Sequence, residues 1–191
     1  HEMVFLNWKP MSKNLSLEEY ARLMAEDIDP SEAFALIGVS MGGMIAVEVS
    51  KFLNPAKTII ISSAKNRNEF QWHIKLSRAL RLHYLNTDWM QKQFSLAFRN
   101  VLGAQKGSSS ENIVAMLQDT YKGLRRRTIT IMKWKAIDDP ENVIHIHGTN
   151  DKTLSHKAVG RIDHLVEGGT HIMIYDQAEE LSKLILKYLK E

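Results

Sequence analysis

A serine, an aspartate and a histidine, at Ser40, Asp151 and His171, each follow a short apolar run that is typical of a buried strand. A serine hydroxyl is a weak nucleophile at neutral pH. It needs an imidazole to remove its proton and a carboxylate to hold that imidazole in the correct tautomer. In parallel sheets the loops that follow the strands converge at one edge, where ligands bind. We therefore expect the three side chains to meet at that edge and to support acyl transfer through Ser40.

The residues around Ser40 have the pattern of a sharp strand-to-helix turn. Ser40 lies between the apolar run 34–39 and the segment 44–53, whose apolar residues recur at helical spacing. Gly38 and Gly42 stand two residues on either side, where we expect a Cβ to collide with the opposite limb of the turn. The pattern is the G-x-S-x-G nucleophile elbow, which exposes a serine beside a helix amino terminus. The alternatives are a turn serine or a glycine-rich loop that binds a phosphate.

Other carboxylates compete for the role of the acid. Asp151 could serve only as a turn former after Asn150, in which case Asp138 or Asp139 would supply the carboxylate. We favour Asp151, because it lies in the short loop after the apolar run that ends at residue 147 and because the order serine, aspartate, histidine is the one expected for this kind of fold.

Two further histidines, His145 and His147, compete with His171. They alternate on a predicted buried strand and face the same side, which favours a packed, hydrogen-bonded role. His171 follows two glycines in a loop that can present its ring. The histidines lack the helical pairing of a zinc site, and no carboxylate cluster accompanies them, so we expect neither a metal nor a cofactor.

The composition is that of one domain without covalent cross-links. A chain of 191 residues can bury about 70% of the surface that its unfolded form exposes. The absence of cysteine excludes cysteine chemistry and fits a reducing compartment, so we expect a cytoplasmic protein. No apolar run approaches the ~18 residues of a membrane span, and we expect no membrane partner.

Basic residues are concentrated in the middle of the chain. Residues 65–135 contain 14 Lys and Arg against 4 Asp and Glu, although the net charge of the whole chain is only +3. Such a segment could bind nucleic acid, face an anionic substrate, or form a solvated helical surface. Apart from Arg125–Arg127 its basic residues are scattered, and no nucleic-acid motif accompanies them. We therefore favour a solvated surface and expect no nucleic-acid partner.

The order of predicted elements indicates an α/β fold with a mostly parallel, doubly wound sheet. Ser16 and Glu19 form a predicted capping box, and Asp176 with Glu179 marks the start of the last helix. The predicted strands cover residues 3–8, 34–39, 58–62, 142–147 and 161–166, and the predicted helices cover residues 17–28, 44–53 and 176–190.

The alternation of strands and helices stops after residue 63. Helical patterns cover residues 70–85, 89–102 and 111–124, and residues 128–134 fit either a strand or a helix, of which we favour the helix. The simplest division is a core made of residues 1–64 and 136–191, with residues 65–135 as an all-helical cap inserted between them.

Three segments together resemble the α/β-hydrolase superfamily: Leu36–Met44, Ile146–Asp151 and Gly168–His171. The resemblance covers almost the whole chain. It implies that Ser40 is the nucleophile, His171 the general base and later acid, and Asp151 its orienting partner. It also implies that the backbone amide of Met41 belongs to the oxyanion hole.

The implied function is hydrolysis of an ester or other acyl bond of a small molecule through an acyl-enzyme. Within the same fold, the alternatives are acyl transfer, C–C bond cleavage, perhydrolysis and ligand reception without catalysis. The apolar faces of the predicted cap suggest an apolar acyl or alcohol part, and its basic residues suggest an anionic substituent.

The sequence departs from the family pattern near its beginning. It contains no HG-type loop to supply a second oxyanion amide. If residues 3–8 are the strand after that loop, the strand between them and residues 34–39 is missing, which would leave two buried strands about 10 Å apart. We therefore expect roughly 20 or more residues upstream of His1 that insert as the central strand. Direct pairing of residues 3–8 with residues 34–39 would refute this.

Overall fold

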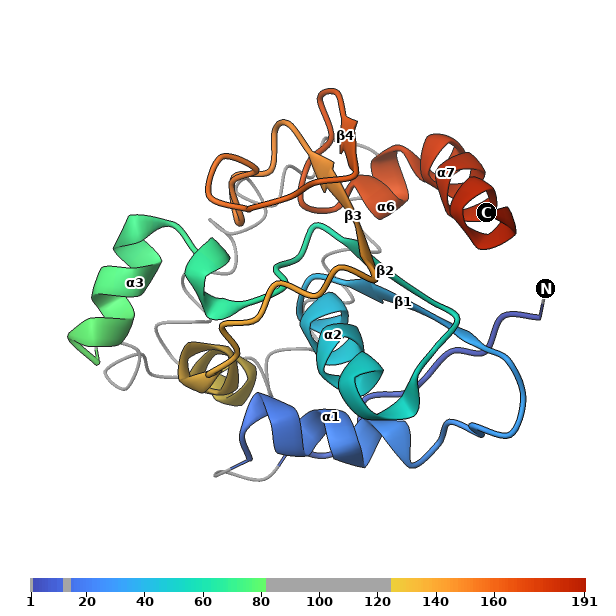
Figure 1. The fold of residues 1–191 in the computed structure, drawn as a ribbon. Helices are drawn as coiled ribbons and strands as arrows, with labels where there is room; N and C mark the ends of the chain where they lie inside the picture. The colour runs from blue at the N-terminus through green and yellow to red at the C-terminus, as the bar shows by residue number, and fades with distance from the viewer. Residues whose placement is uncertain (1, 12–14, 82–124) are drawn as a thin grey trace.

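A parallel sheet lies at the centre of the part of the chain that the structure, a computed structural model, describes: residues 2–11, 15–81 and 125–191 (Figure 1). Its strands lie in the order β1-β2-β3-β4, and each pairs with the next in parallel. The strands are β1 (Ala35–Val39), β2 (Lys57–Ile61), β3 (Val143–Gly148) and β4 (His164–Val166). The parallel α/β sheet that the sequence predicted is confirmed.

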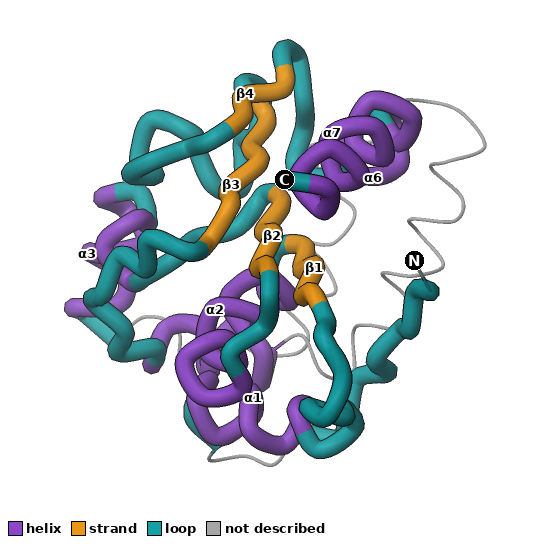
Figure 2. Tube along the Cα trace, turned by 45° about the vertical axis from the view of Figure 1, so that its right-hand side comes forward, coloured by secondary structure: helices purple, strands orange, loops and turns teal. Residues whose placement is uncertain are grey.

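Helices cover both faces of this sheet (Figure 2). One face is covered by α2 (Met41–Leu53), on which α1 (Leu17–Ala25) packs, and the other by α6 (Met173–Asp176) and α7 (Ala178–Lys190). Strand β2 is apolar without alternation because helices cover both of its faces. Ile59 and Ile61 pack toward Met173 and Leu181, while Ile60 packs against Val47 of α2.

Helix α1 begins at the predicted capping box. The backbone N–H of Glu19 donates to Ser16 Oγ at 3.1 Å, and the backbone N–H of Ser16 donates to the Glu19 carboxylate at 2.8 Å. The prediction for the last helix is wrong in detail. Asp176 ends the short helix α6, and α7 begins only at Ala178, with Gln177 as its N-cap. The Asp176 carboxylate instead accepts a hydrogen bond from the Thr170 hydroxyl at 3.3 Å, so it does not cap α7.

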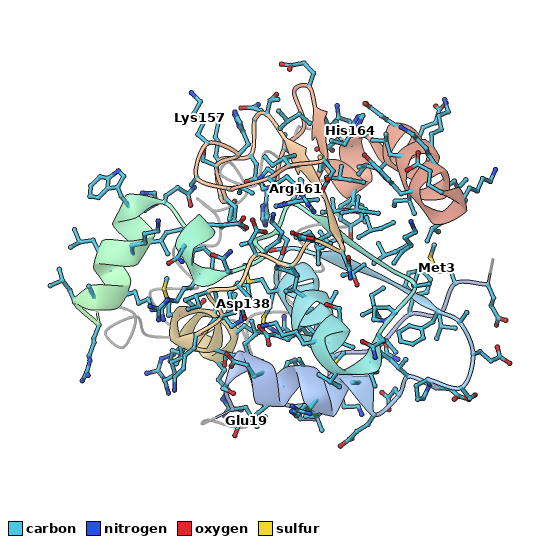
Figure 3. The ribbon with its side chains drawn as sticks, in the orientation of Figure 1. Met3, Glu19, Asp138, Lys157, Arg161 and His164 are labelled. Atoms are coloured by element: carbon cyan, nitrogen blue, oxygen red, sulfur yellow. The ribbon has the colours of Figure 1, made fainter. Side chains whose placement is uncertain are left out.

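The predicted strand at residues 3–8 is also wrong. This segment is irregular, and the side chains of Met3 and Phe5 are 65% and 81% exposed. Figure 3 shows Met3 near the amino-terminal end of the ribbon. An apolar run becomes a strand only when a partner strand accepts its backbone hydrogen bonds. Among the described residues β1 begins the strand order, and residues 3–8 do not pair with it. The expected additional central strand stays a prediction.

The described part of the region between β2 and β3 consists of short helices joined by irregular segments. It contains the 3₁₀ turn η1 (Arg67–Glu69), helix α3 (Trp72–Ala79) and a helix over residues 125–133. The helix favoured for residues 128–134 is thus confirmed. The helices predicted for residues 89–102 and 111–124 lie outside the described residues, so the cap remains a prediction. In the described ranges, no helix has the length and apolar character needed to cross a bilayer.

Candidate active site

Ser40 occupies a strained corner between β1 and α2. Its φ of 52° and ψ of −121° lie in a region that residues other than glycine rarely adopt. Neighbouring groups hold this conformation in place. The Ser40 N–H donates to the Ile61 carbonyl at 2.9 Å, and the Ser40 carbonyl accepts from the Gly43 N–H at 3.0 Å and from Ser63 Oγ at 2.7 Å. The half-buried Ser40 side chain therefore stands at the carboxyl end of β1.

Glycine is required at one of the two predicted positions beside Ser40. A Cβ at Gly38 would overlap the backbone of Gly42, as the elbow pattern predicts. The same prediction for Gly42 is wrong, because a Cβ there meets no described atom within 4 Å. Only one residue of this close pair needs to lack a side chain. The second tight position is Gly43, where a Cβ would overlap the Ser63 side chain.

The loops that carry Asp151 and His171 are joined backbone to backbone. The Asn150 N–H donates to the Gly169 carbonyl at 2.9 Å, and the Thr149 N–H donates to the Val166 carbonyl at 3.0 Å. A Cβ at Gly148 would overlap Gly169, so glycine permits this approach. The ends of β3 and β4 thereby bring the two side chains together.

The structure brings the three predicted residues into one hydrogen-bonded line. His171 Nε2 lies 3.0 Å from Ser40 Oγ, and His171 Nδ1 lies 2.8 Å from Asp151 Oδ2. Asp151 and His171 are only 4% and 6% exposed. An ionised carboxylate only accepts hydrogen bonds, so it assigns the ring proton to Nδ1 and leaves Nε2 able to accept the serine proton. This geometry suits a general base acting on Ser40.

Asp151 is ionised in this environment. Burial raises the pKa of Asp151, but hydrogen bonds from His147 and His171 outweigh it and hold that pKa well below its ordinary range. Its other oxygen, Oδ1, accepts from the backbone N–H groups of Thr153 and Leu154, each at 2.8 Å. Asp151 is therefore a turn former through one oxygen and a partner of His171 through the other.

The alternative carboxylates lie elsewhere. Asp139 lies 2.6 Å from the Nζ atom of the fully buried Lys65. Figure 3 shows Asp138 in the loop that leads toward β3. The position of Asp139 thus has a structural explanation of its own, and Asp151 is the carboxylate that meets His171.

His145 and His147 are fully buried on β3, as their alternation predicts. Their rings are joined by a contact of 2.9 Å between His147 Nδ1 and His145 Nε2. Burial, together with the nearby His147 and Lys65, lowers the pKa of His145 to about 3. The sequence analysis missed one contact, in which His147 Nε2 lies 3.3 Å from Asp151 Oδ2. The only signal for it is that both residues stand near the end of one strand.

The remaining predicted residue, Met41, is the first residue of α2 and directly follows Ser40. The first amides of a helix have no intrahelical acceptor, so they are available to a ligand. In the part of the chain that the structure describes, no group of three or more His, Cys, Asp or Glu side chains is arranged to hold a metal ion.

Comparisons with known proteins agree on one family. The profile described as "Alpha/beta hydrolase family" matches residues 9–184. Similar solved structures include a thermophilic esterase, with 16% identity, a TM-score of 0.68 and coverage of 94% of this chain and 75% of the other. A lipase-esterase related protein from Clostridium acetobutylicum ATCC 824 has 18% identity, a TM-score of 0.65 and coverage of 90% and 75%.

A meta-cleavage product hydrolase from Pseudomonas fluorescens IP01 has 16% identity, a TM-score of 0.54 and coverage of 95% and 74%. No curated protein matches the sequence significantly. At identities this low, the similarity to solved structures establishes the fold.

Replacing Gly38 by alanine tests the close packing of the elbow. Because the new Cβ would overlap backbone, Gly38→Ala is expected to lower the free energy of unfolding by about 1–3 kcal/mol in urea denaturation. Gly42→Ala is the matched control. The new Cβ meets open space on a helix, so we expect Gly42→Ala to leave the free energy of unfolding unchanged or to raise it by up to about 1 kcal/mol. Equal losses in both variants would contradict this account of the turn.

The buried His145 predicts a pH dependence of stability. Its pKa falls from 6.5 to about 3 on folding, so between these pH values the unfolded chain binds a proton that the folded protein excludes. The free energy of unfolding should therefore fall as the pH drops below 6.5, with a contribution from His145 of up to about 1.4 kcal/mol per pH unit. His145→Gln keeps a hydrogen-bond donor but cannot titrate. In urea denaturation between pH 6.5 and 4.5, its free energy of unfolding should therefore change less with pH than that of the wild type. If the free energies of unfolding of the wild type and of His145→Gln change equally with pH, His145 is not the source of the dependence.

Proposed function

The chain belongs to the alpha/beta hydrolase family, and from that premise we propose that it is a serine hydrolase that cleaves an ester or other acyl bond of a small molecule. The observation that carries the proposal is the line of contacts from Asp151 through His171 to Ser40, at 2.8 and 3.0 Å. A structural serine has no need of an imidazole whose far nitrogen is held by a buried carboxylate. The three side chains together meet the requirement of nucleophilic catalysis.

In the proposed reaction, Ser40 Oγ attacks the carbonyl carbon of the substrate while His171 Nε2 takes its proton. The tetrahedral intermediate collapses when the same nitrogen returns the proton to the leaving group, which leaves an acyl group on Ser40. A water molecule, activated by His171, then releases the acid. Asp151 keeps the imidazole in the tautomer that this sequence needs and stabilises the imidazolium that forms.

The oxyanion of the intermediate would lie beside the amino terminus of α2. The backbone amide of Met41 is the proposed donor, and one such donor contributes about 3 kcal/mol of transition-state stabilisation. The thirteen residues of α2 add the positive end of their helix dipole at the same place. Ser40 is the residue directly before this end of the helix.

We further propose that residues 65–135 form a helical cap that shapes the substrate site. Helix α3 carries Trp72 and Leu76 four residues apart, with Leu80 directly after the helix, and the three side chains are 74%, 48% and 59% exposed. These apolar side chains at helical spacing support a substrate with an apolar acyl or alcohol part. The excess of basic residues in the segment supports an anionic substituent.

Cleavage of a C–C bond is the second candidate. It is supported by the structural similarity to the meta-cleavage product hydrolase, whose name gives a class of substrate different from that of the esterases. The same three side chains can serve either reaction. A panel of esters that varies acyl length and charge, assayed beside a meta-cleavage product, distinguishes the two candidates. Turnover of the meta-cleavage product alone would favour C–C cleavage.

Labelling with a fluorophosphonate probe tests the activated serine. We expect the protein to be labelled and Ser40→Ala to lose the label. Ser31→Ala is a matched control on an exposed turn and should label like the wild type. His171→Gln should label at least about 100-fold more slowly, because the hydroxyl then lacks its general base. Absence of label in the wild type, or retention of label in Ser40→Ala, would overturn the proposal.

A further inference from the structure

The carboxylate of Asp151 is approached by two imidazole rings. His171 Nδ1 lies 2.8 Å from Oδ2, and His147 Nε2 lies 3.3 Å from the same oxygen. His147 is fully buried on β3, beneath the site, and its Nε2 also lies 2.8 Å from the Leu154 carbonyl. We propose that His147 is a positioning residue for Asp151, and that His145 fixes the orientation of His147. The inference rests on the proposed function, in which Asp151 orients His171.

The partners of His147 determine which of its nitrogens carries hydrogen. The Leu154 carbonyl and the ionised Asp151 are acceptors only, so His147 Nε2 must be a donor. The Nδ1 atom of a neutral His147 is then an acceptor, and it receives the Nε2–H of His145 at 2.9 Å. The remaining nitrogen, His145 Nδ1, is buried and makes no hydrogen bond of good geometry among the described residues, and the backbone of Ser63 also acts on the His145 ring. Donation thus runs in one direction, from His145 to Asp151.

This arrangement completes the set of donors around Asp151. Oδ1 receives two backbone N–H groups, from Thr153 and Leu154. Oδ2 receives the Nδ1–H of His171 and shares the single Nε2–H of His147 with the Leu154 carbonyl. Four donors fix the plane of the carboxylate and make it a weaker base. A weaker base pulls less strongly on the proton that His171 Nδ1 shares with it. The loss of His147 would therefore move the acid limb of the rate–pH profile to higher pH.

Charged groups face the histidine pair from the neighbouring segments. Lys65, which follows β2, is fully buried and lies 2.6 Å from Asp139 and 3.9 Å from Glu69. Asp163, which precedes β4, accepts the backbone N–H of His145 at 2.8 Å. Lys65 and the burial of the ring both disfavour a second proton on His145. His145 is therefore a neutral donor to His147.

Two substitutions at His147 separate its hydrogen bond from its packing. Phenylalanine keeps the ring and removes the donor, whereas the side-chain amide of glutamine can place an N–H near the position of Nε2. In His147→Phe we expect fluorophosphonate labelling to slow by about tenfold at neutral pH and the acid limb to rise by about one pH unit. His147→Gln should recover most of both effects.

A matched variant controls for loss of stability in the same strand. Ile146→Ala removes a fully buried side chain on the opposite face of β3 and does not touch Asp151. It should lower the free energy of unfolding and leave the acid limb where it is in the wild type. The inference is refuted if His147→Phe keeps the wild-type acid limb, or if His147→Gln shifts it as far as His147→Phe does.

Nitrogen NMR of the histidine rings tests the same contact without catalysis. In ¹⁵N-histidine-labelled Ser40→Ala protein, His147 should carry its proton on Nε2 and His145 should also carry its proton on Nε2. A proton on Nδ1 of His147, with Nε2 bare, would overturn the inference. If the wild type fails to label with the probe while His147 shows the Nε2–H form, the proposed hydrolysis is wrong and the contact with Asp151 stands.

Discussion

The hydrogen bond between His171 Nδ1 and Asp151 Oδ2 joins two loops that would otherwise be independent. Its length depends on the approach of the two chain segments at Gly148 and Gly169, which the parallel pairing of β3 and β4 sets up. Because both partners are buried, the bond is protected from water. The hydrogen bonds to Asp151 outweigh the effect of its burial and keep the carboxylate ionised. The orientation of the imidazole, and with it the proposed reactivity of Ser40, depends on this contact.

The position of Ser40 depends on a strained backbone conformation. Ser40 is held at a positive φ by hydrogen bonds from both sides of the turn, including one from Ser63 after β2. The surrounding sheet and α2 are densely apolar, and their burial offsets the cost of this conformation, which is about 1–3 kcal/mol. The site therefore combines a sheet edge with a serine whose backbone conformation is unfavourable on its own and is maintained by its neighbours.

The sequence predicted the parts of the site that depend on local spacing. The elbow around Ser40 and the placement of Asp151 and His171 follow from glycine positions and from apolar runs that end at one sheet edge. The contact of His147 with Asp151 could not be predicted, because it depends on ring orientations set by tertiary packing. The segment 3–8 has an apolar pattern like that of a strand, but a pattern does not supply the partner strand. Asp176 has the right residue type for a helix cap, yet the turn before it is already helical.

A crystal structure of the protein after reaction with a fluorophosphonate tests the central claim most directly. The account predicts phosphorus bonded to Ser40 Oγ, a phosphonyl oxygen within hydrogen-bond distance of the Met41 amide, and His171 still bonded to Asp151 through Nδ1. It would be contradicted by an adduct on a different side chain, or by a Ser40 adduct from which the His171 ring is turned away.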